Sequence, residues 1–302
     1  METNSSKSFL GTSTDIGVPF IAVANHKGGV GKTTTTLNVA ADLALFYGKK
    51  VLVMDMDKQA HCAFFSGLER REGIEKLFSA NYKQVVLSEL VQKIDLTDNL
   101  CIDLLGNIGS HGRGLERVER AMVKNDDRDN IYDLVINLIK AHRYFFGQYD
   151  VVLIDCPPGV TMITKNIYRF ADYIIIPTSA HESSFDGIDQ LVREVARYSG
   201  KVKSKVMGFV LTREKPHSAV RSTILKFSEG LLRAKSLQMR IPVIGYIPES
   251  ARVEEATTKS LGTCPSLAVY APKSKPAVAY EALTDNVAKM FGWKKQSKRG
   301  GK

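Results

Sequence analysis

The sequence of 302 residues contains no apolar run approaching the roughly 18 residues that a membrane-spanning helix requires. Its four cysteines, Cys62, Cys101, Cys156 and Cys264, are scattered and form no Cys-x-x-Cys pair. This spacing argues against a disulfide framework and against a zinc or iron–sulfur site. The Ser/Thr-rich N-terminus lacks the basic region and apolar core of a secretory signal. We therefore expect a cytoplasmic protein.

Acidic residues are scarce in the last third of the chain. Residues 201–302 contain 20 Lys and Arg against 7 Asp and Glu, a net charge of +13. The preceding 200 residues contain 22 against 25, a net charge of −3. Such asymmetry is typical of a protein that binds a polyanion, either a nucleic-acid backbone or an anionic membrane surface. A solvated basic face that only serves solubility is the simpler alternative.

Short β-branched runs alternate with longer helical patterns, which predicts an α/β fold with a mainly parallel sheet flanked by helices on both faces. The expected strands are nearly all apolar, as strands buried on both faces should be. They are Val18–Asn25, Lys50–Asp55, Asp150–Asp155, Tyr173–Pro177, Val206–Thr212 and Val243–Ile247. The region from Asp57 to Asp150 has a mainly helical pattern. We expect one domain, residues 18–293, between a flexible tail of residues 1–17 and a basic tail of residues 294–302.

A glycine-rich loop, Lys27-Gly28-Gly29-Val30-Gly31-Lys32-Thr33, follows the first expected strand and precedes a helical pattern at Thr33–Tyr47. This is the context of a phosphate-binding loop, whose glycines let backbone N–H groups surround the phosphates. Lys32 is placed to reach the β- and γ-phosphates, and the Thr33 hydroxyl to ligate Mg²⁺. The sequence therefore predicts binding of ATP and Mg²⁺. The expected nucleotide contacts in the loop are Gly28, Gly29, Val30, Gly31, Lys32, Thr33 and Thr34.

With its second lysine, Lys27, the loop resembles the deviant Walker A family of P-loop NTPases, which includes ParA, MinD and the nitrogenase iron protein. The shared pattern, Lys-Gly-Gly-x-Gly-Lys-Thr-Thr, stands here at Lys27–Thr34. The resemblance implies slow, partner-stimulated ATP hydrolysis in which both Lys27 and Lys32 take part. It also implies a homodimer, because in this family the extra lysine reaches the phosphates of the partner subunit. Dimerisation would then depend on bound nucleotide.

Two carboxylate elements extend the resemblance. Asp55-Met56-Asp57 is similar to the family's Asp-x-Asp-Pro-Gln element, whose second aspartate positions the attacking water, so Asp57 is expected to be catalytic. Lys58 stands where proline is usual, which leaves the rigidity of this loop open. Val151–Gly159 matches a Walker B strand and its switch loop. Asp155 is therefore expected to hold Mg²⁺ through water, together with Thr33.

The resemblance covers roughly residues 20–290 and points to the ParA/Soj branch. Ile247–Ala256 is similar to the segment that runs from the base-binding loop into a short helix, which places Pro248 in the nucleotide site. Tyr270–Tyr280 resembles the ending of chromosomal and plasmid ParA proteins. In that branch the ATP-bound dimer binds nucleoid DNA without sequence preference and is released when a ParB-like partner stimulates hydrolysis. The expected DNA contacts are Arg213, Lys215, Arg221, Arg252, Lys273 and Lys275.

Several alternatives stay open. The same cycle could position a cargo other than DNA, such as a protein assembly. A MinD-like membrane switch would insert the C-terminal segment Val287–Lys295 into anionic lipid. However, Leu283, Val287 and Met290 are spaced as a core-facing stripe with Gly292 ending the helix, which makes membrane binding the less favoured reading. The sequence lacks the cysteine pair that a reductase of this family would need, and it lacks an acceptor site that a kinase would need. The short N-terminal arm argues against an operator-reading domain.

Overall fold

The structure is a computed structural model that describes residues 15–79, 81–109, 114–124, 131–179, 184–199, 206–214, 241–257 and 265–296. The strands are β1 Phe20–Val23, β2 Val51–Asp55, β3 Gln92–Thr97, β4 Leu100–Leu105, β5 Val151–Asp155, β6 Tyr173–Ser179, β7 Val206–Glu214 and β8 Val243–Pro248. The helices are α1 Lys32–Tyr47, α2 His61–Phe65, α3 Leu87–Leu90, α5 Gly114–Lys124, α6 Leu134–Ala141, α7 Arg143–Phe146, α8 Met162–Phe170, α9 Ser184–Ser199, α12 Ala251–Ala256, α13 Leu267–Tyr270 and α14 Lys275–Met290. Short 3-10 helices lie at Ile74–Phe78, Tyr82–Gln84 and Ile131–Asp133.

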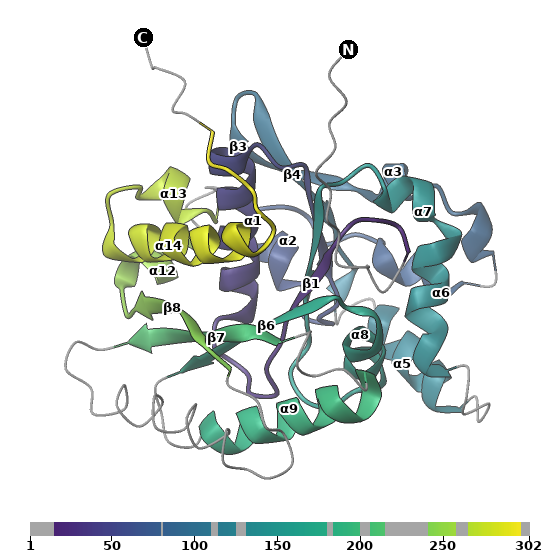
Figure 1. Ribbon diagram of the computed structural model, residues 1–302. Coiled ribbons are helices and arrows are strands. Elements are labelled where there is room, and N and C mark those ends of the chain that lie inside the picture. Colours follow the sequence, from purple (N-terminus) through teal and green to yellow (C-terminus); the bar gives the residue numbers. More distant parts are fainter. Residues whose placement is uncertain are drawn as a thin grey trace.

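The described strands form one sheet in the order β3-β4-β2-β5-β1-β6-β7-β8, with helices around it (Figure 1). Only β3 is antiparallel to its neighbour, and the other neighbouring strands are parallel. Parallel neighbours need a crossover connection, which here is usually a helix. The predicted α/β fold with a mainly parallel sheet is therefore confirmed.

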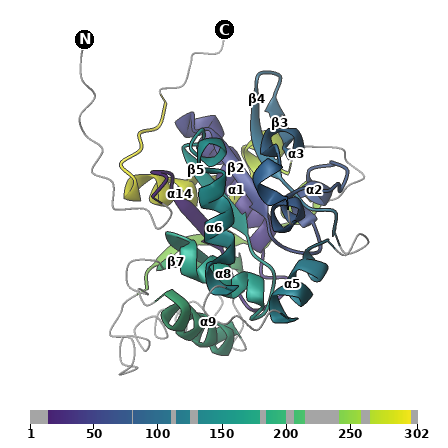
Figure 2. The same ribbon diagram turned by 90° about the vertical axis from the view of Figure 1, so that its right-hand side faces the viewer.

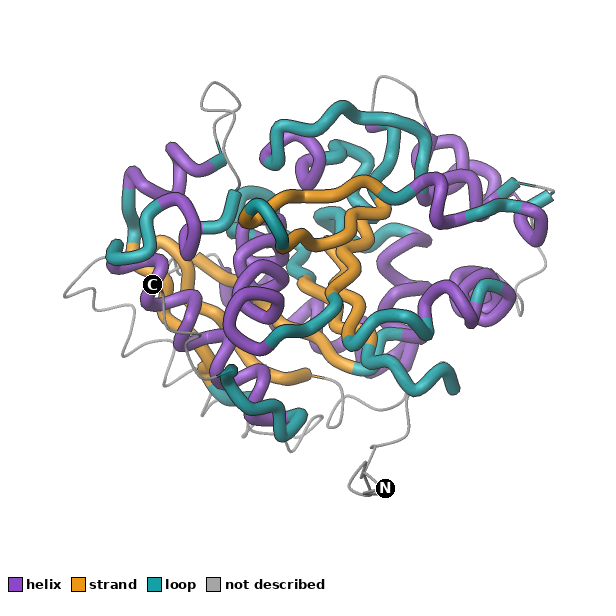
Figure 3. The backbone as a smooth tube through the Cα atoms, turned by 90° about the horizontal axis from the view of Figure 1, so that it is seen from above, coloured by secondary structure: helices purple, strands orange, loops and turns teal. Residues whose placement is uncertain are grey.

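Helices cover both faces of this sheet because side chains alternate along each strand. In β1, Phe20 and Ala22 belong to a core shared with α5, α6, α8 and α9. The residues between and after them, Ile21 and Val23, belong to a second core, shared with α1, α12, α13 and α14. Figure 2 looks onto the side of α6 and α8, and Figure 3 shows helices on either side of the strands. Burial on both faces explains why these strands are apolar throughout.

The middle region, expected to be mainly helical, also contains the hairpin β3–β4. The turn Asp98-Asn99 joins the two strands, and such residues favour tight turns. Along β3, Ile94 and Leu96 are buried whereas Lys93 and Asp95 are exposed. This alternation runs over the five residues 93–97, and it arises because a strand at the edge of the sheet needs apolar side chains on one face alone. So short an alternation is hard to distinguish from the helical patterns on either side of it.

The C-terminal helix confirms part of the predicted stripe. α14 ends before Gly292, whose φ of 65° is left-handed and suits glycine after a helix. Leu283 and Val287 are fully buried, but Met290 is 50% exposed because it lies in the last turn, beyond the covered part of the helix. The Phe291 ring stacks on the Trp293 ring that follows, with centroids 4.6 Å apart. None of the described helices is long and apolar enough to cross a membrane.

One carboxyl group is enclosed where α14 packs on α1. Asp42 is 1% exposed, and the Thr284 hydroxyl donates a hydrogen bond to its Oδ2 at 3.3 Å. Burial raises the pKa of Asp42 from 3.8 to about 8; Glu281 and Asp285 add to the rise, and Lys295 opposes it. The folded protein therefore keeps a proton that the unfolded chain releases in mildly acidic solution.

We expect Asp42→Asn to stabilise the protein, by an amount that grows as the pH rises from about 4 to about 8. In this window only the folded wild type holds the proton, so it loses up to about 1.4 kcal/mol of stability per pH unit. Above the folded pKa of Asp42, neither the folded nor the unfolded wild type holds the proton, so the loss of stability stops growing. The amide of the variant has no such proton and still accepts from Thr284. Urea unfolding across this pH range measures the effect, with exposed Asp98→Asn as control. A gain independent of pH would contradict the assignment.

Candidate functional site

The strand register brings the predicted site residues together. Asp55, the last residue of β2, is the register partner of Asp155, the last residue of β5. Asp155 is in turn the register partner of Val23, where β1 ends and the glycine loop begins. The loop and both carboxylates therefore meet at the carboxyl edge of the sheet, which is where open α/β sheets bind ligands.

The glycine loop has the backbone conformation that its glycines permit. Gly29 and Gly31 have φ values of 73° and 85°, in the left-handed region that side chains disfavour. Gly31 is also the N-cap of α1, so the first helical N–H groups face the loop. The Lys32 ammonium donates to the carbonyl oxygen of Lys27 at 3.0 Å and closes the loop. This geometry suits a phosphate cradle with the helix N-terminus behind it.

Thr33 and Asp155, the predicted magnesium residues, are in contact. The Thr33 hydroxyl donates to Asp155 Oδ2 at 2.6 Å, and the Cys62 thiol lies 3.5 Å from the same oxygen. The second oxygen, Oδ1, is buried and has no hydrogen-bond partner within the described part of the chain. Burial raises the pKa of Asp155 to about 7, and the neighbouring Asp57 adds to this rise. A buried, unpartnered carboxylate oxygen beside a hydroxyl fits the oxygen ligands that Mg²⁺ prefers.

Asp57, the predicted catalytic residue, lies in a tightly bonded turn after β2. Its N–H donates to Asp55 Oδ1 at 3.1 Å, and its own Oδ1 accepts from the N–H of Gln59 at 3.0 Å. Asn107, just after β4, donates to the backbone oxygens of Asp55 and Asp57 at 3.0 and 2.9 Å. Asn107 is not among the predicted site residues, because its role depends on β4, a strand that the sequence pattern does not predict. With Lys58 in place of proline, these side-chain bonds hold the turn.

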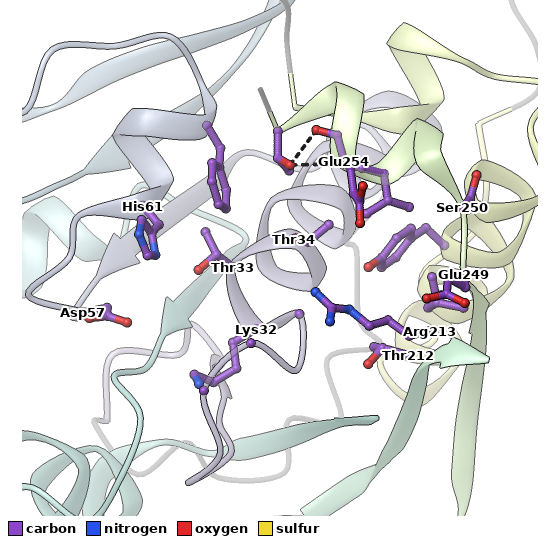
Figure 4. Close-up of a pocket in the computed structure, with 18 of the residues that line it drawn as sticks. Lys32, Thr33, Thr34, Asp57, His61, Thr212, Arg213, Glu249, Ser250 and Glu254 are labelled. Atoms are coloured by element: carbon purple, nitrogen blue, oxygen red, sulfur yellow. Dashed lines mark hydrogen bonds between the residues drawn. The ribbon is translucent and has the colours of Figure 1, made fainter. Parts of the chain in front are cut away.

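A cleft with a volume of about 380 Å³ opens in front of the loop (Figure 4), within the size range of small-molecule sites. Lys32 lines this cleft but is only 7% exposed. Burial lowers the pKa of the Lys32 ammonium, whereas the nearby Asp155 and Asp57 raise that pKa. Val30 is buried behind the loop. The predicted nucleotide residues that line the cleft are Gly28, Gly29, Gly31, Lys32, Thr33, Thr34 and Pro248. His61 and Tyr280 also line it and were not singled out from the sequence.

Arg213, one of the residues predicted to contact DNA, lines the cleft. Its φ of 54° is uncommon for a residue with a side chain. The hydroxyl of the preceding Thr212 lies 2.9 Å from the carbonyl oxygen of Val30, which fastens the end of β7 to the glycine loop. Figure 4 shows the Arg213 side chain pointing into the cleft, towards the loop. A guanidinium at this place would meet a bound nucleotide.

The other residues predicted to contact DNA lie elsewhere. Arg252 on α12 is 58% exposed, and Lys273 and Lys275 are exposed at the start of α14. Arg252 donates to Glu255 on its own helix at 2.8 Å, and Tyr270 of α13 donates to the same carboxylate at 3.1 Å. Two further predicted contacts, Lys215 and Arg221, lie outside the described residues.

Comparisons with known proteins point to one family. The family model described as an AAA domain (AAA_31) matches residues 18–207, more than half of the chain. The sporulation initiation inhibitor protein Soj of Bacillus subtilis is 29% identical over 272 residues, covering 89% of this chain and 97% of Soj. The chromosome partitioning protein ParA of Caulobacter vibrioides is 28% identical, over 78% and 82% of the two chains. The ATP complex of a McdA variant from Cyanothece shares the fold, with a TM-score of 0.71, 19% identity, and coverage of 93% and 99%.

The geometry of the cleft agrees with these relationships. A glycine loop at a helix N-terminus, a threonine–aspartate pair and a further carboxylate at one edge of a sheet are the parts that bind and hydrolyse a nucleoside triphosphate. The chain therefore belongs to the AAA-domain family AAA_31 and is a P-loop NTPase of the ParA/MinD type.

Proposed function

We propose that this protein is an ATP-driven switch for DNA partition. ATP brings two copies together, the dimer binds DNA without sequence preference, and hydrolysis stimulated by a ParB-like partner releases it. The protein would act in the cytoplasm on the nucleoid. The observation that carries this proposal is that α12 lines the nucleotide cleft with Val253 and Glu254 and carries the exposed Arg252.

One face of α12 and the segment before it line the cleft. Glu249, Ser250, Val253 and Glu254 all contribute to its wall. Arg252 sits among them in sequence but is exposed, and its carboxylate partner Glu255 is bonded to α13. A nucleotide that moves the wall would therefore move Arg252. Because α12 both lines the cleft and carries the exposed Arg252, it would couple bound nucleotide to the outer surface.

Arg252, Lys273 and Lys275 form what we call the basic surface. Arg252 lies on α12, Lys273 lies in the loop between α13 and α14, and Lys275 begins α14. α12 packs on α13, and α13 packs on α14. Contacts to DNA phosphates need charge and reach, but no base-reading geometry. The net charge of +13 over residues 201–302 adds a longer-range attraction for a polyanion. Binding of this kind would be independent of sequence and sensitive to salt.

In hydrolysis, the loop N–H groups and Lys32 would bind the phosphates of ATP, and Asp57 would orient the attacking water. Thr33 and Asp155 would hold Mg²⁺, which would supply positive charge to the phosphate oxygens. Buried charges act more strongly here than in water, because little solvent screens them. The low exposure of Lys32 and Asp57, 7% and 6%, supports this arrangement.

Dimerisation rests on Lys27, which does not line the cleft of its own subunit. Its backbone is engaged in the loop, where its N–H donates to Asn25 Oδ1 at 3.0 Å and its carbonyl accepts from Lys32. We assign its side chain to the nucleotide bound by a second copy.

The membrane alternative has less support, because the aromatic rings of the C-terminal segment have partners. Phe291 packs edge-on against Tyr173 at 5.1 Å, and the Lys49 ammonium lies 4.9 Å from the Trp293 ring centre.

The proposal is tested by DNA binding of a variant with all three residues of the basic surface replaced by alanine. We expect its ATP-dependent DNA affinity to fall roughly 10-fold or more, with the slope of log affinity against log salt reduced by up to about three. Nucleotide affinity should not change. A control variant removes three exposed lysines of the opposite face, Lys83, Lys124 and Lys140, and so loses the same charge.

Sedimentation with DNA and with anionic liposomes distinguishes the candidate functions. The partition reading requires that ATP and DNA together carry wild-type protein into the pellet. Equal loss of DNA binding in the variant and its control would show that only total charge matters. Recruitment by liposomes in ATP, with no binding to DNA, would replace the proposal with the membrane switch.

A further inference from the structure

His61 lies on the wall of the cleft beside Asp57. It is the first residue of α2 and is half-buried. Its imidazole stacks face to face on Phe65, one turn later, with ring centroids 5.3 Å apart and an angle of 6° between the planes. Figure 4 shows His61 and Asp57 together on one side of the cleft, facing Lys32 and Thr33. The ring is therefore oriented by packing, and it lines the same cleft as Lys32 and Thr33, the residues assigned to the phosphates and to Mg²⁺.

The backbone between these two residues is fixed by several bonds. Ala60, which precedes α2, has a left-handed φ of 50°, a conformation that costs an alanine on the order of 1 kcal/mol. Its N–H donates to the Asp57 carbonyl at 2.9 Å, and its carbonyl accepts from Arg70 Nε at 3.3 Å. Asn107 holds the same Asp57 carbonyl at 2.9 Å. Such strain, held by side chains from distant segments, sets the imidazole and the carboxylate in fixed relative positions.

The burial of His61 favours the neutral form of its ring. Burial lowers the pKa of His61, and Arg70 and Lys32 lower it further, although Asp57 opposes them. A neutral imidazole has one nitrogen that donates and one that accepts. The ring can therefore accept a hydrogen bond from water while its other nitrogen donates to a phosphate oxygen. Packing alone, with His61 serving only as a flat partner for Phe65, needs neither nitrogen.

We propose that His61 is a catalytic residue that, together with Asp57, holds the water that attacks the γ-phosphate. This inference rests on the ATP hydrolysis proposed above. Asp57 accepts one O–H of the water and the imidazole accepts the other, so that an oxygen lone pair points at phosphorus. The water oxygen then bonds to the γ-phosphorus, and the bond from that phosphorus to the β,γ-bridging oxygen breaks. ADP leaves with the electron pair, and a water proton passes through Asp57 to the phosphate product.

The test compares His61→Phe, which keeps an aromatic ring on Phe65, with His61→Asn, which keeps hydrogen-bonding groups without the ring. ATP turnover and binding of a fluorescent ATP analogue are measured for each with Mg²⁺. We expect His61→Phe to lower kcat at least about 10-fold with nucleotide affinity changed by less than about twofold. His61→Asn should retain more activity than His61→Phe. The unchanged affinity also shows that the phenylalanine variant folds.

The pH profile separates catalysis from packing. Wild-type kcat should fall on the acid side as the imidazole gains a proton and its acceptor nitrogen is lost, and His61→Phe should lack this limb. A His61→Phe protein with kcat within about twofold of wild type, or with the same acid limb, would overturn the role of His61 and leave the proposed function intact. A wild-type protein that binds the ATP analogue and never hydrolyses ATP, even with DNA present, would overturn both.

Discussion

Asp57→Ala is expected to lower the rate of ATP hydrolysis by at least about 10²-fold while ATP binding persists. The carboxylate is 6% exposed and its turn is bonded on both sides, so it is poised to orient water. Phosphate binding falls to other groups, namely Lys32 and the loop N–H groups. The variant should therefore accumulate as an ATP-bound dimer and stay on DNA after wild type has been released.

Single-turnover hydrolysis, light scattering and DNA pelleting with saturating ATP measure the three consequences. Asp98→Ala is the control, because it removes an exposed carboxylate that does not line the cleft. Its hydrolysis rate should stay within about threefold of wild type. If Asp57→Ala were monomeric with saturating ATP, or hydrolysed it at the wild-type rate, the role assigned to this carboxylate would be lost.

Lys32→Ala should remove nucleotide binding itself. The ammonium is 7% exposed and faces the cleft, where its attraction for a phosphate is poorly screened. Loss of a buried charged contact costs about 2–5 kcal/mol, which corresponds to an affinity loss of at least about 30-fold. Because Lys32 also closes the loop through its 3.0 Å bond to Lys27, the empty loop should become less ordered. Calorimetric titration with ADP and with an ATP analogue measures the loss.

Lys27→Ala is the matched variant, since it removes the other lysine of the same loop. It should bind nucleotide within about threefold of wild type, yet fail to dimerise with ATP, because the partner's phosphates lose their cross-subunit charge. Analytical ultracentrifugation with and without ATP separates the two lysines. Equal effects of both substitutions on nucleotide affinity would show that Lys27 acts within its own subunit.

The sequence predicted well those parts of the molecule in which one short segment determines the structure. The strands of the parallel sheet are apolar because both faces are buried, and the glycine loop has the dihedral angles its residues suggest. Asp155 could be placed because its strand leads directly to it. Register then brought Asp55 and the loop to the same edge, a consequence of parallel strands rather than of any single motif.

Other parts depend on contacts between distant segments and left little local signal. Asn107 holds the Asp57 turn from 50 residues away, and Thr212 holds Val30 from 182 away. Arg213 is a predicted DNA contact, and the sequence gives no sign that it also lines the cleft at the end of β7 with a left-handed backbone angle. The role proposed for His61 follows only from its position in the cleft beside Asp57. In each case the residue type is compatible with many roles, and the fold selects among them.

The charged edge strand β3 bears on how copies of this protein meet. An unpaired, apolar strand at the edge of a sheet can form backbone hydrogen bonds with a strand of another molecule. Here Lys93 and Asp95 alternate with the two buried residues of a strand that carries no further partner among the described segments. Charges at this position disfavour continuous sheets across subunits, and with them uncontrolled fibre growth. Under the proposed function, association would then be left to surfaces that ATP controls, which is what a reversible switch requires.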